Sequence, residues 1–170
     1  MISKRKTEVF IGLGSNLGNR KENLVRAVRE MGLYPISIKK ISSIYETSPV
    51  GPGQRNFLNS VLKGETPLPP RSLLQVLKTI ERKMGREKTA RWGPRKIDLD
   101  ILFYGRKKLQ TRVLKIPHPQ FSKRKFVLRP LVEIAPLYKP AGFSKTVLRL
   151  ARELTDPNQK VRLFSRFPSI

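Results

Sequence analysis

The chain has 170 residues, and its 36 lysines and arginines against 12 aspartates and glutamates give a formal net charge of +24. The absence of cysteine excludes disulfides and cysteine-ligated metal sites, the single histidine excludes the usual multi-histidine sites, and no apolar run of about 18 residues could form a spanning helix. Such a charge attracts polyanions, so nucleic acid, an anionic membrane and nucleotide phosphates are all candidate partners.

Hydrophobic periodicity predicts an alternation of strands and helices along the chain. The predicted strands cover residues 7–16, 36–47, 57–66, 96–105 and 160–167. The predicted helices cover residues 17–33, 67–85 and 144–154. Asn19 and Gly32 are candidate caps of the first helix, and the alternation slips within 36–47. Gly105 is expected to begin a hairpin from the strand 96–105 to the segment "KLQTRVLKI".

The first six elements follow the order βαββαβ. This order predicts an α+β fold, a ferredoxin-like sandwich in which helices cover one face of an antiparallel sheet, with extra C-terminal elements. We expect a single catalytic domain over 1–170, with residues 1–6 as a flexible tail. The first apolar run is about five residues long, shorter than the core of a secretory signal, which favours a cytoplasmic location.

Two of the three aspartates stand together in the sequence "RWGPRKIDLDILFYG", which covers residues 91–105. In a strand, Asp98 and Asp100 would point to the same face, with Cα atoms about 7 Å apart, because side chains alternate. Two carboxylates on one face need a positive group between them. That group is either Mg²⁺, for which carboxylates and substrate phosphates are suitable ligands, or neighbouring arginines such as Arg91 and Arg95.

Other segments offer both functional and structural interpretations. The sequence "GLGSNLGNRK" over 12–21 fits neither the dinucleotide fingerprint nor the P-loop, so it is at least as well explained as a tight turn. His118, set between two prolines, is either structural or a phosphate contact. Phe57 and Phe126 are either core residues or the two sides of a slot for a flat heterocycle, whose edge Asn59 could bind through its amide.

Four segments in this order resemble the 6-hydroxymethyl-7,8-dihydropterin pyrophosphokinase family of folate biosynthesis: "GLGSNLGNR", "YETSPVGPGQRNFLNSV", "GREKTARWGPRKIDLDIL" and "IPHPQFSKRKFVLRPL". The resemblance covers about Val9 to Pro136. The fold that it implies is a ferredoxin-like α+β sandwich, which is similar to the one predicted above from the order of the elements. It implies transfer of pyrophosphate from ATP to the hydroxymethyl group of the pterin, with Mg²⁺ as cofactor and AMP as the second product.

The resemblance also implies roles for individual residues. Asp98 and Asp100 would hold two Mg²⁺ ions and, with Arg86 and Arg95, form the catalytic group. The implied ATP contacts are Arg86, Lys88, Arg95, Ile101, His118 and Arg124. The implied pterin contacts are Thr47, Ser48, Val50, Phe57, Asn59, Trp92 and Phe126. Glu81 matches an acid of the family's active site, without an assigned role.

The chain departs from the family pattern at a few positions. Phe57 and Pro119 stand where many relatives have tyrosine, and the basic segment between Gly85 and Trp92 is about one residue shorter than in some relatives, which weakens the match at Lys88. A basic RNA-binding protein on the same scaffold is the alternative, supported by the charge but leaving the aspartate pair unexplained. We expect a monomer that binds small molecules, with neither a membrane nor a specific nucleic acid as partner.

Overall fold

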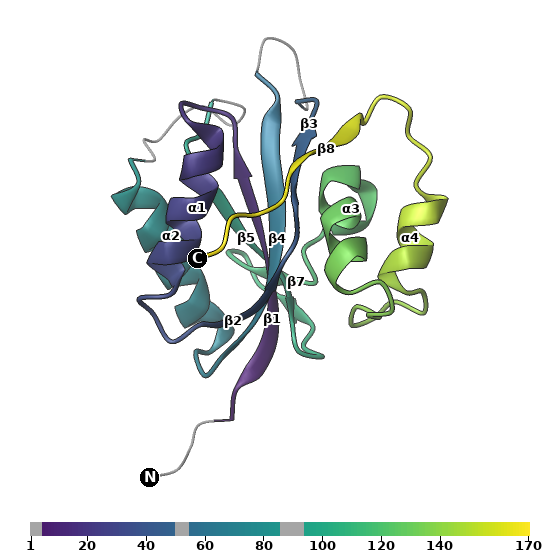
Figure 1. The fold of residues 1–170 in the computed structure, drawn as a ribbon. Coiled ribbons are helices and arrows are strands. Elements are labelled where there is room, and N and C mark those ends of the chain that lie inside the picture. The colour runs from purple at the N-terminus through teal and green to yellow at the C-terminus, as the bar shows by residue number, and fades with distance from the viewer. Residues whose placement is uncertain (1–4, 50–54, 86–93) are drawn as a thin grey trace.

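The computed structural model describes residues 5–49, 55–85 and 94–170, arranged as a sheet with helices packed on it (Figure 1). The strands are β1 (Thr7–Ser15), β2 (Ser37–Ile41), β3 (Ile44–Thr47), β4 (Phe57–Thr66), β5 (Asp98–Tyr104), β6 (Leu109–Gln110), β7 (Lys115–Ile116) and β8 (Val161–Ser165). The helices are α1 (Arg20–Met31), α2 (Pro70–Lys83), the short 3-10 turn η1 (Phe121–Lys123), α3 (Lys125–Ile134) and α4 (Val147–Glu153). Among these helices, none is long and apolar enough to cross a membrane.

The main sheet is antiparallel throughout its described strands. Its order is β5-β1-β4-β3-β8, and β2 also pairs with β4. β1 and β4 are therefore the central strands, β5 lies at one edge, and the C-terminal strand β8 lies at the other, beside β3. β6 and β7 form a separate hairpin with each other. The expected hairpin between the strand that ends at Gly105 and this segment is wrong, because β5 pairs with β1 in the main sheet.

Helices cover both faces of the sheet, which corrects the expectation of a single covered face. Alternate residues of β1 enter different cores: Val9 and Ile11 pack with α1 and α2, whereas Phe10 packs with α3 and α4. Figure 1 shows the two helix pairs on opposite sides of the strands. The second core includes an aromatic cluster in which the rings of Phe10 and Phe103 meet edge to face with centroids 5.5 Å apart.

The predicted elements differ from the observed ones at two further places. The strand predicted over 36–47 is two strands, because the side chain of Ser42 accepts a hydrogen bond from the N–H of Val61 (3.0 Å) and interrupts the regular pairing with β4. The helix α3 was not predicted, because Pro130 lies inside it and three basic residues precede its apolar positions. The cap of α1 is confirmed, since Asn19 accepts a hydrogen bond from Glu22.

Candidate active site

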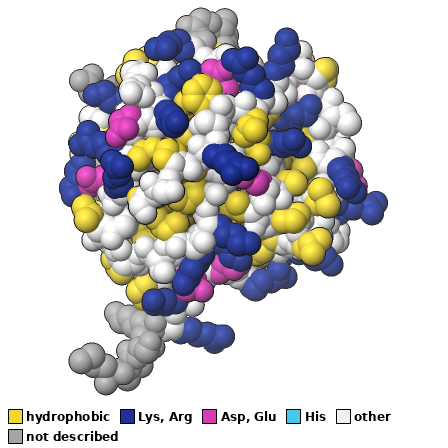
Figure 2. Space-filling view, in the orientation of Figure 1, with side chains coloured by type: hydrophobic (Ala, Val, Ile, Leu, Met, Phe, Trp, Pro, Cys, Tyr) yellow, Lys and Arg dark blue, Asp and Glu magenta, His cyan; other side chains and the backbone are white. Residues whose placement is uncertain are grey.

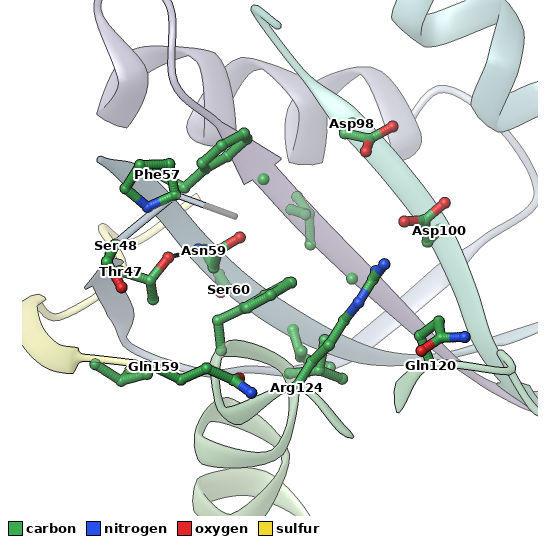
Figure 3. A pocket seen from close by; sticks show the side chains of 18 of the residues that line it. Thr47, Ser48, Phe57, Asn59, Ser60, Asp98, Asp100, Gln120, Arg124 and Gln159 are labelled. Carbon is green, nitrogen blue, oxygen red and sulfur yellow. Dashed lines mark hydrogen bonds between the residues drawn. The ribbon is translucent and has the colours of Figure 1, made fainter. Parts of the chain in front are cut away.

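A pocket of about 840 Å³ lies on the α3 face of the sheet. Its walls come from β1, β3, β4, β5, the segment around His118 and α3, and the segment before β8. In Figure 3, Asp98 and Asp100 stand at one end, Thr47, Ser48 and Phe57 stand at the other, and Asn59 lies between them. An acidic end and an aromatic, hydrogen-bonding end therefore share one cavity.

The two aspartates lie on one face of β5, as their spacing predicts. Both line the pocket and are half-buried, while the intervening Leu99 is fully buried in the core on the other face. Ile101, expected among the ATP contacts, is only 2% exposed and packs in that same core, so its side chain does not line the pocket. Any contact of Ile101 with a nucleotide would have to use its backbone.

The donor set fits a hard divalent cation bound together with its substrate. The described residues contain no group of three or more acidic, histidine or cysteine ligands. Mg²⁺ does not need such a group, since it is commonly held by one or two carboxylates with waters and substrate phosphates completing the coordination. The carboxylates of Asp98 and Asp100, which face the cavity, are suitable for this role. The Arg95 guanidinium donates to the Asp98 carboxylate at 2.9 Å, so a positively charged side chain also belongs to this end of the pocket.

Glu81 does not line the pocket but supports the strand that carries the aspartates. It is 1% exposed, and its carboxylate accepts a hydrogen bond from the N–H of Leu99 at 2.7 Å. Lys78 donates both to this carboxylate (2.9 Å) and to the carbonyl of Leu99 (3.2 Å). Burial raises the pKa of the Glu81 carboxyl, and the charge of Lys78 opposes this rise. The two side chains of α2 thus bind the backbone between the two aspartates.

The glycine-containing turn after β1 binds protein backbone in the structure. Asn16, which is 1% exposed, accepts a hydrogen bond from the N–H of Arg95 at 2.6 Å and donates its own N–H to the Arg95 carbonyl at 3.0 Å. This pair fixes the start of the segment that leads to Asp98. Asn16 is a residue that sequence reasoning missed, although it stands in the quoted "GLGSN" segment that resembles the family.

His118 lies in the pocket as a neutral imidazole. The imidazole Nδ1 accepts a hydrogen bond from the backbone N–H of Gln120 at 3.1 Å, and the backbone N–H of His118 donates to the Leu102 carbonyl at 2.9 Å. Burial and the nearby charge of Arg124 lower the pKa of His118 to about 4. At neutral pH the remaining proton is therefore on Nε2, which leaves a hydrogen-bond donor beside Arg124.

The other end of the pocket has the form of the expected slot. Phe57 and Phe126 are half-buried and line the cavity, so neither is a fully buried core residue. Asn59 donates its amide N–H to the hydroxyl of Thr47 at 2.8 Å, and both residues are almost completely buried. The guanidinium of Arg124 lies 5.5 Å from the centroid of the Phe126 ring.

A glycine of β1 leaves room for this amide. A Cβ at Gly14 would come within 3.0 Å of the Asn59 side-chain oxygen and 3.8 Å of the Phe57 ring. Contacts of about 3.0 Å to a Cβ are rare, so any larger residue would displace Asn59 or narrow the cavity. The floor of the pocket therefore depends on the absence of a side chain at position 14.

Comparison with known proteins assigns the family. The model described as 7,8-dihydro-6-hydroxymethylpterin-pyrophosphokinase (HPPK) matches residues 10–136. The chain belongs to this family. It is 44% identical over 129 residues to the 2-amino-4-hydroxy-6-hydroxymethyldihydropteridine pyrophosphokinase of Aquifex aeolicus, covering 75% of this chain and 80% of that protein. It is 51% identical to the folate synthesis bifunctional protein of Arabidopsis thaliana, again over 75% of this chain.

The chain spans about a quarter of the length of the plant relatives, 27% in the Arabidopsis protein above and 24% in a mitochondrial one. Among solved structures, a Plasmodium falciparum HPPK-DHPS aligns with a TM-score of 0.70 at 16% identity, over 90% of this chain and 44% of that one. At that identity the likeness shows the fold alone, a mixed α/β structure with an antiparallel sheet. The comparisons give no support to the RNA-binding alternative.

The distribution of charge agrees with this result. Figure 2 shows Lys and Arg side chains spread over the whole visible face, without one basic patch. The cations most relevant to an HPPK site are those that line the pocket, and among the described residues these are Arg95, Lys123, Arg124 and Lys160. Of the expected contacts, Val50, Arg86, Lys88 and Trp92 lie outside the described residues.

The C-terminal wall of the pocket was not predicted. Asp156, Asn158, Gln159, Lys160 and Val161 line the cavity. These residues follow the part of the chain that the HPPK model matches, and no sequence motif marks them. Their place in the pocket depends on the pairing of β8 with β3, which joins Thr47 to Val161 across the sheet.

Proposed function

We propose that the protein transfers pyrophosphate from ATP to 6-hydroxymethyl-7,8-dihydropterin, forming AMP and the pterin pyrophosphate. The observation that carries this proposal is that Asp98 and Asp100 open into the same cavity as Asn59 and the two phenylalanines. A cation-binding end suits the polyphosphate of ATP, and a flat slot with a polar floor suits a fused heterocycle. The family relationship supports both assignments.

At the pterin end, the rings of Phe57 and Phe126 would stack on the two faces of the heterocycle. Asn59 and Thr47 supply amide and hydroxyl groups that bind the donors and acceptors of its edge. Both groups already bind each other at 2.8 Å, so their positions are set before the substrate arrives. Such preorganisation reduces the conformational entropy lost on binding.

At the ATP end, Asp98 and Asp100 would hold two Mg²⁺ ions. Bound there, the ions would neutralise charge on the transferred phosphates. Arg95 and Arg124 would add positive charge, and the neutral His118 would offer its Nε2–H as a hydrogen-bond donor to a phosphate oxygen. Four expected contacts lie outside the described residues. We propose that Arg86 and Lys88 bind the phosphates of ATP and that Val50 and Trp92 bind the pterin.

The reaction requires alignment more than covalent assistance. The hydroxymethyl oxygen forms a bond to the β-phosphorus, the bond from that phosphorus to the oxygen bridging the α-phosphorus breaks, and the hydroxyl proton is released. AMP leaves with the bridging oxygen. The pocket contributes by holding both reactants in line and by stabilising the negative charge that develops on the phosphates.

We propose that the sheet and its helices form a ferredoxin-like sandwich extended by α3, α4 and β8. If β2 and β3 are counted as one strand, the strands β1, β2/β3, β4 and β5 are numbers 1 to 4 along the chain. In the sheet they lie in the order 4-1-3-2, which supports this fold. We also propose a single catalytic domain that acts as a monomer in the cytoplasm.

The test is AMP formation from ATP, Mg²⁺ and 6-hydroxymethyl-7,8-dihydropterin by the purified protein. We expect AMP only when pterin and Mg²⁺ are both present, and loss of turnover in Asp98→Ala and Asp100→Ala with the fold retained. Glu22→Ala is the matched control, because Glu22 is 59% exposed on α1, away from the pocket. Near-normal turnover by either aspartate variant would refute the metal assignment, and a folded wild type without turnover would refute the proposed activity.

A further inference from the structure

The segment Asp156–Val161 connects the two sides of the pocket. It leaves α4, passes the beginning of α3 and enters β8 beside β3 (Figure 1). It lies beyond the residues that the HPPK model matches, so the family relationship assigns it no role. Hydrogen bonds that involve backbone groups join it to the beginning of α3 and to Ser48, the residue directly after β3.

On the α3 side, Gln159 provides the cap that the helix lacks. The N-cap position of α3, Arg124, makes no side-chain capping hydrogen bond. Instead the Gln159 amide oxygen accepts from the N–H of Lys125 at 2.8 Å, and its amide nitrogen donates to the Lys123 carbonyl at 2.9 Å. The same nitrogen donates to the Asp156 carboxylate at 3.0 Å. The amide thus holds the backbone on both sides of Arg124.

On the β3 side, the segment binds the end of the strand that carries Thr47. The N–H of Ser48 donates to the Lys160 carbonyl at 3.2 Å. The Ser48 hydroxyl donates to the Asn158 carbonyl at 3.3 Å and accepts from the N–H of Lys160 at 3.3 Å. Gln159 therefore lies between two residues whose backbone binds Ser48, directly after β3, and its side chain reaches across to the beginning of α3.

The rest of α3 is held by other contacts. Val127, Leu128 and Leu131 pack in the second core. Farther along, the Glu133 carboxylate accepts hydrogen bonds from Ser43 and from the hydroxyl of Tyr45 at 2.8 Å. These contacts fix the helix on the sheet, and Val127 and Leu128 already belong to its first turn. The backbone on both sides of Arg124, where the helix begins, is bound by the Gln159 amide, and the Lys125 side chain adds a hydrogen bond to the Asp156 carbonyl of the same segment.

From this arrangement we infer that Gln159 is a positioning residue, which sets the place of Phe126 and Arg124 relative to Thr47 and Asn59 across the pterin slot. The inference rests on the proposed function, because it takes the slot to bind the pterin ring. A ring stacked on both faces tolerates little change in the separation of the walls, so loss of the Gln159 contacts should weaken pterin binding more than ATP binding. Of the described residues assigned to ATP, only Arg124 adjoins the Gln159 amide, whereas Asp98, Asp100, Arg95 and His118 stand on other segments, so ATP should lose less affinity than the pterin.

The experiment compares Gln159→Ala with wild type and with Gln75→Ala, which removes an exposed amide from α2 on the opposite face. Titration of 6-hydroxymethyl-7,8-dihydropterin in the presence of Mg²⁺ and α,β-methylene-ATP, whose α–β linkage cannot be cleaved, measures pterin affinity without turnover. We expect Gln159→Ala to raise the pterin Kd about tenfold, as for loss of one to two net hydrogen bonds, and the KM for ATP by less than about threefold. Gln75→Ala should change neither.

A second pair of variants separates positioning from general stabilisation. Gln159→Glu keeps an acceptor for Lys125 but places a second carboxylate against Asp156, and it should weaken pterin binding at least as much as alanine. Adding Asp156→Asn restores a donor–acceptor pair and should recover most of the lost affinity. A lower melting temperature with unchanged pterin Kd would overturn the inference, as would equal losses of pterin and ATP affinity. Failure of the wild type to bind pterin would instead refute the proposed function.

Discussion

Replacement of Glu81 by alanine tests whether α2 supports the metal-binding strand. The substitution removes the acceptor of the Leu99 N–H, which lies 2.7 Å from the carboxylate at a fully buried residue. An unsatisfied buried N–H costs about 1–3 kcal/mol, and the space left by the missing side-chain atoms adds about 1 kcal/mol. Burial raises the pKa of the Glu81 carboxyl, so loss of the buried charge offsets part of this cost.

We therefore expect the free energy of unfolding of Glu81→Ala to fall by about 3 kcal/mol, which lowers the melting temperature of a chain of this size by roughly 6–12 °C. Glu81→Gln should lose only about 1 kcal/mol, because its amide oxygen can still accept from Leu99. Denaturant unfolding followed by circular dichroism measures both values. Glu65→Ala is the control, since this acid is 41% exposed in its ion pair with Lys39 and should change stability by less than about 0.5 kcal/mol.

The hydrogen bond between Glu81 and Leu99 should also affect activity. Leu99 stands between Asp98 and Asp100, so a looser β5 should reduce turnover at temperatures where Glu81→Ala is still folded, whereas Glu81→Gln should retain most of it. An alanine variant as stable as wild type would refute the argument from the Leu99 hydrogen bond. So would a glutamine variant destabilised as much as the alanine variant.

Three further substitutions test the pocket itself. Gly14→Ala should weaken pterin binding about tenfold by displacing Asn59, whereas Gly12→Ala, whose Cβ would meet only Leu102 at an ordinary 3.5 Å, should have a smaller effect; equal effects would contradict the steric argument. The pKa of His118 is about 4 in the folded protein, below its ordinary 6.5, so the unfolded chain binds the extra proton at a higher pH than the folded chain. The free energy of unfolding should therefore fall as the pH drops from 6.5 to 4, by at most about 3 kcal/mol. His118→Asn should lack this part of the pH dependence, and an imidazole that titrates near 6.5 by NMR would contradict it. Arg95→Ala should lower kcat at least about a hundredfold with little change in pterin affinity, and the opposite pattern would move Arg95 to the pterin.

Much of the fold could be read from local patterns. The alternation of β5 placed Asp98 and Asp100 on one face and Leu99 on the other, and the structure has this arrangement because strand geometry fixes it for any residue. The capping residue Asn19 was equally local. The quoted segments sufficed to recognise the family, which the match over 10–136 confirms.

Other features depend on contacts between distant segments, which periodicity does not contain. Covering of both sheet faces follows from α3, whose apolar positions are interrupted by Pro130 and preceded by basic residues. In the sequence, the spacing of Glu81 does not distinguish it from the exposed charged residues of an amphipathic helix. Its contact with β5 exists only because α2 packs against that strand. Its burial and its bond to Leu99 exist only in the folded chain.

The sequence by itself thus determined the family, the order of most elements and the place of the aspartate pair on one face of a strand, since these depend on residue type and short spacing. Only the tertiary structure decided which segments complete the pocket. The Gln159 amide and the Lys125 N–H are 34 residues apart along the chain and meet at 2.8 Å because β8 pairs with β3 and brings the C-terminal segment to the beginning of α3. Hydrogen bonds of this kind are set by the packing of whole elements, and no local pattern of residues specifies them.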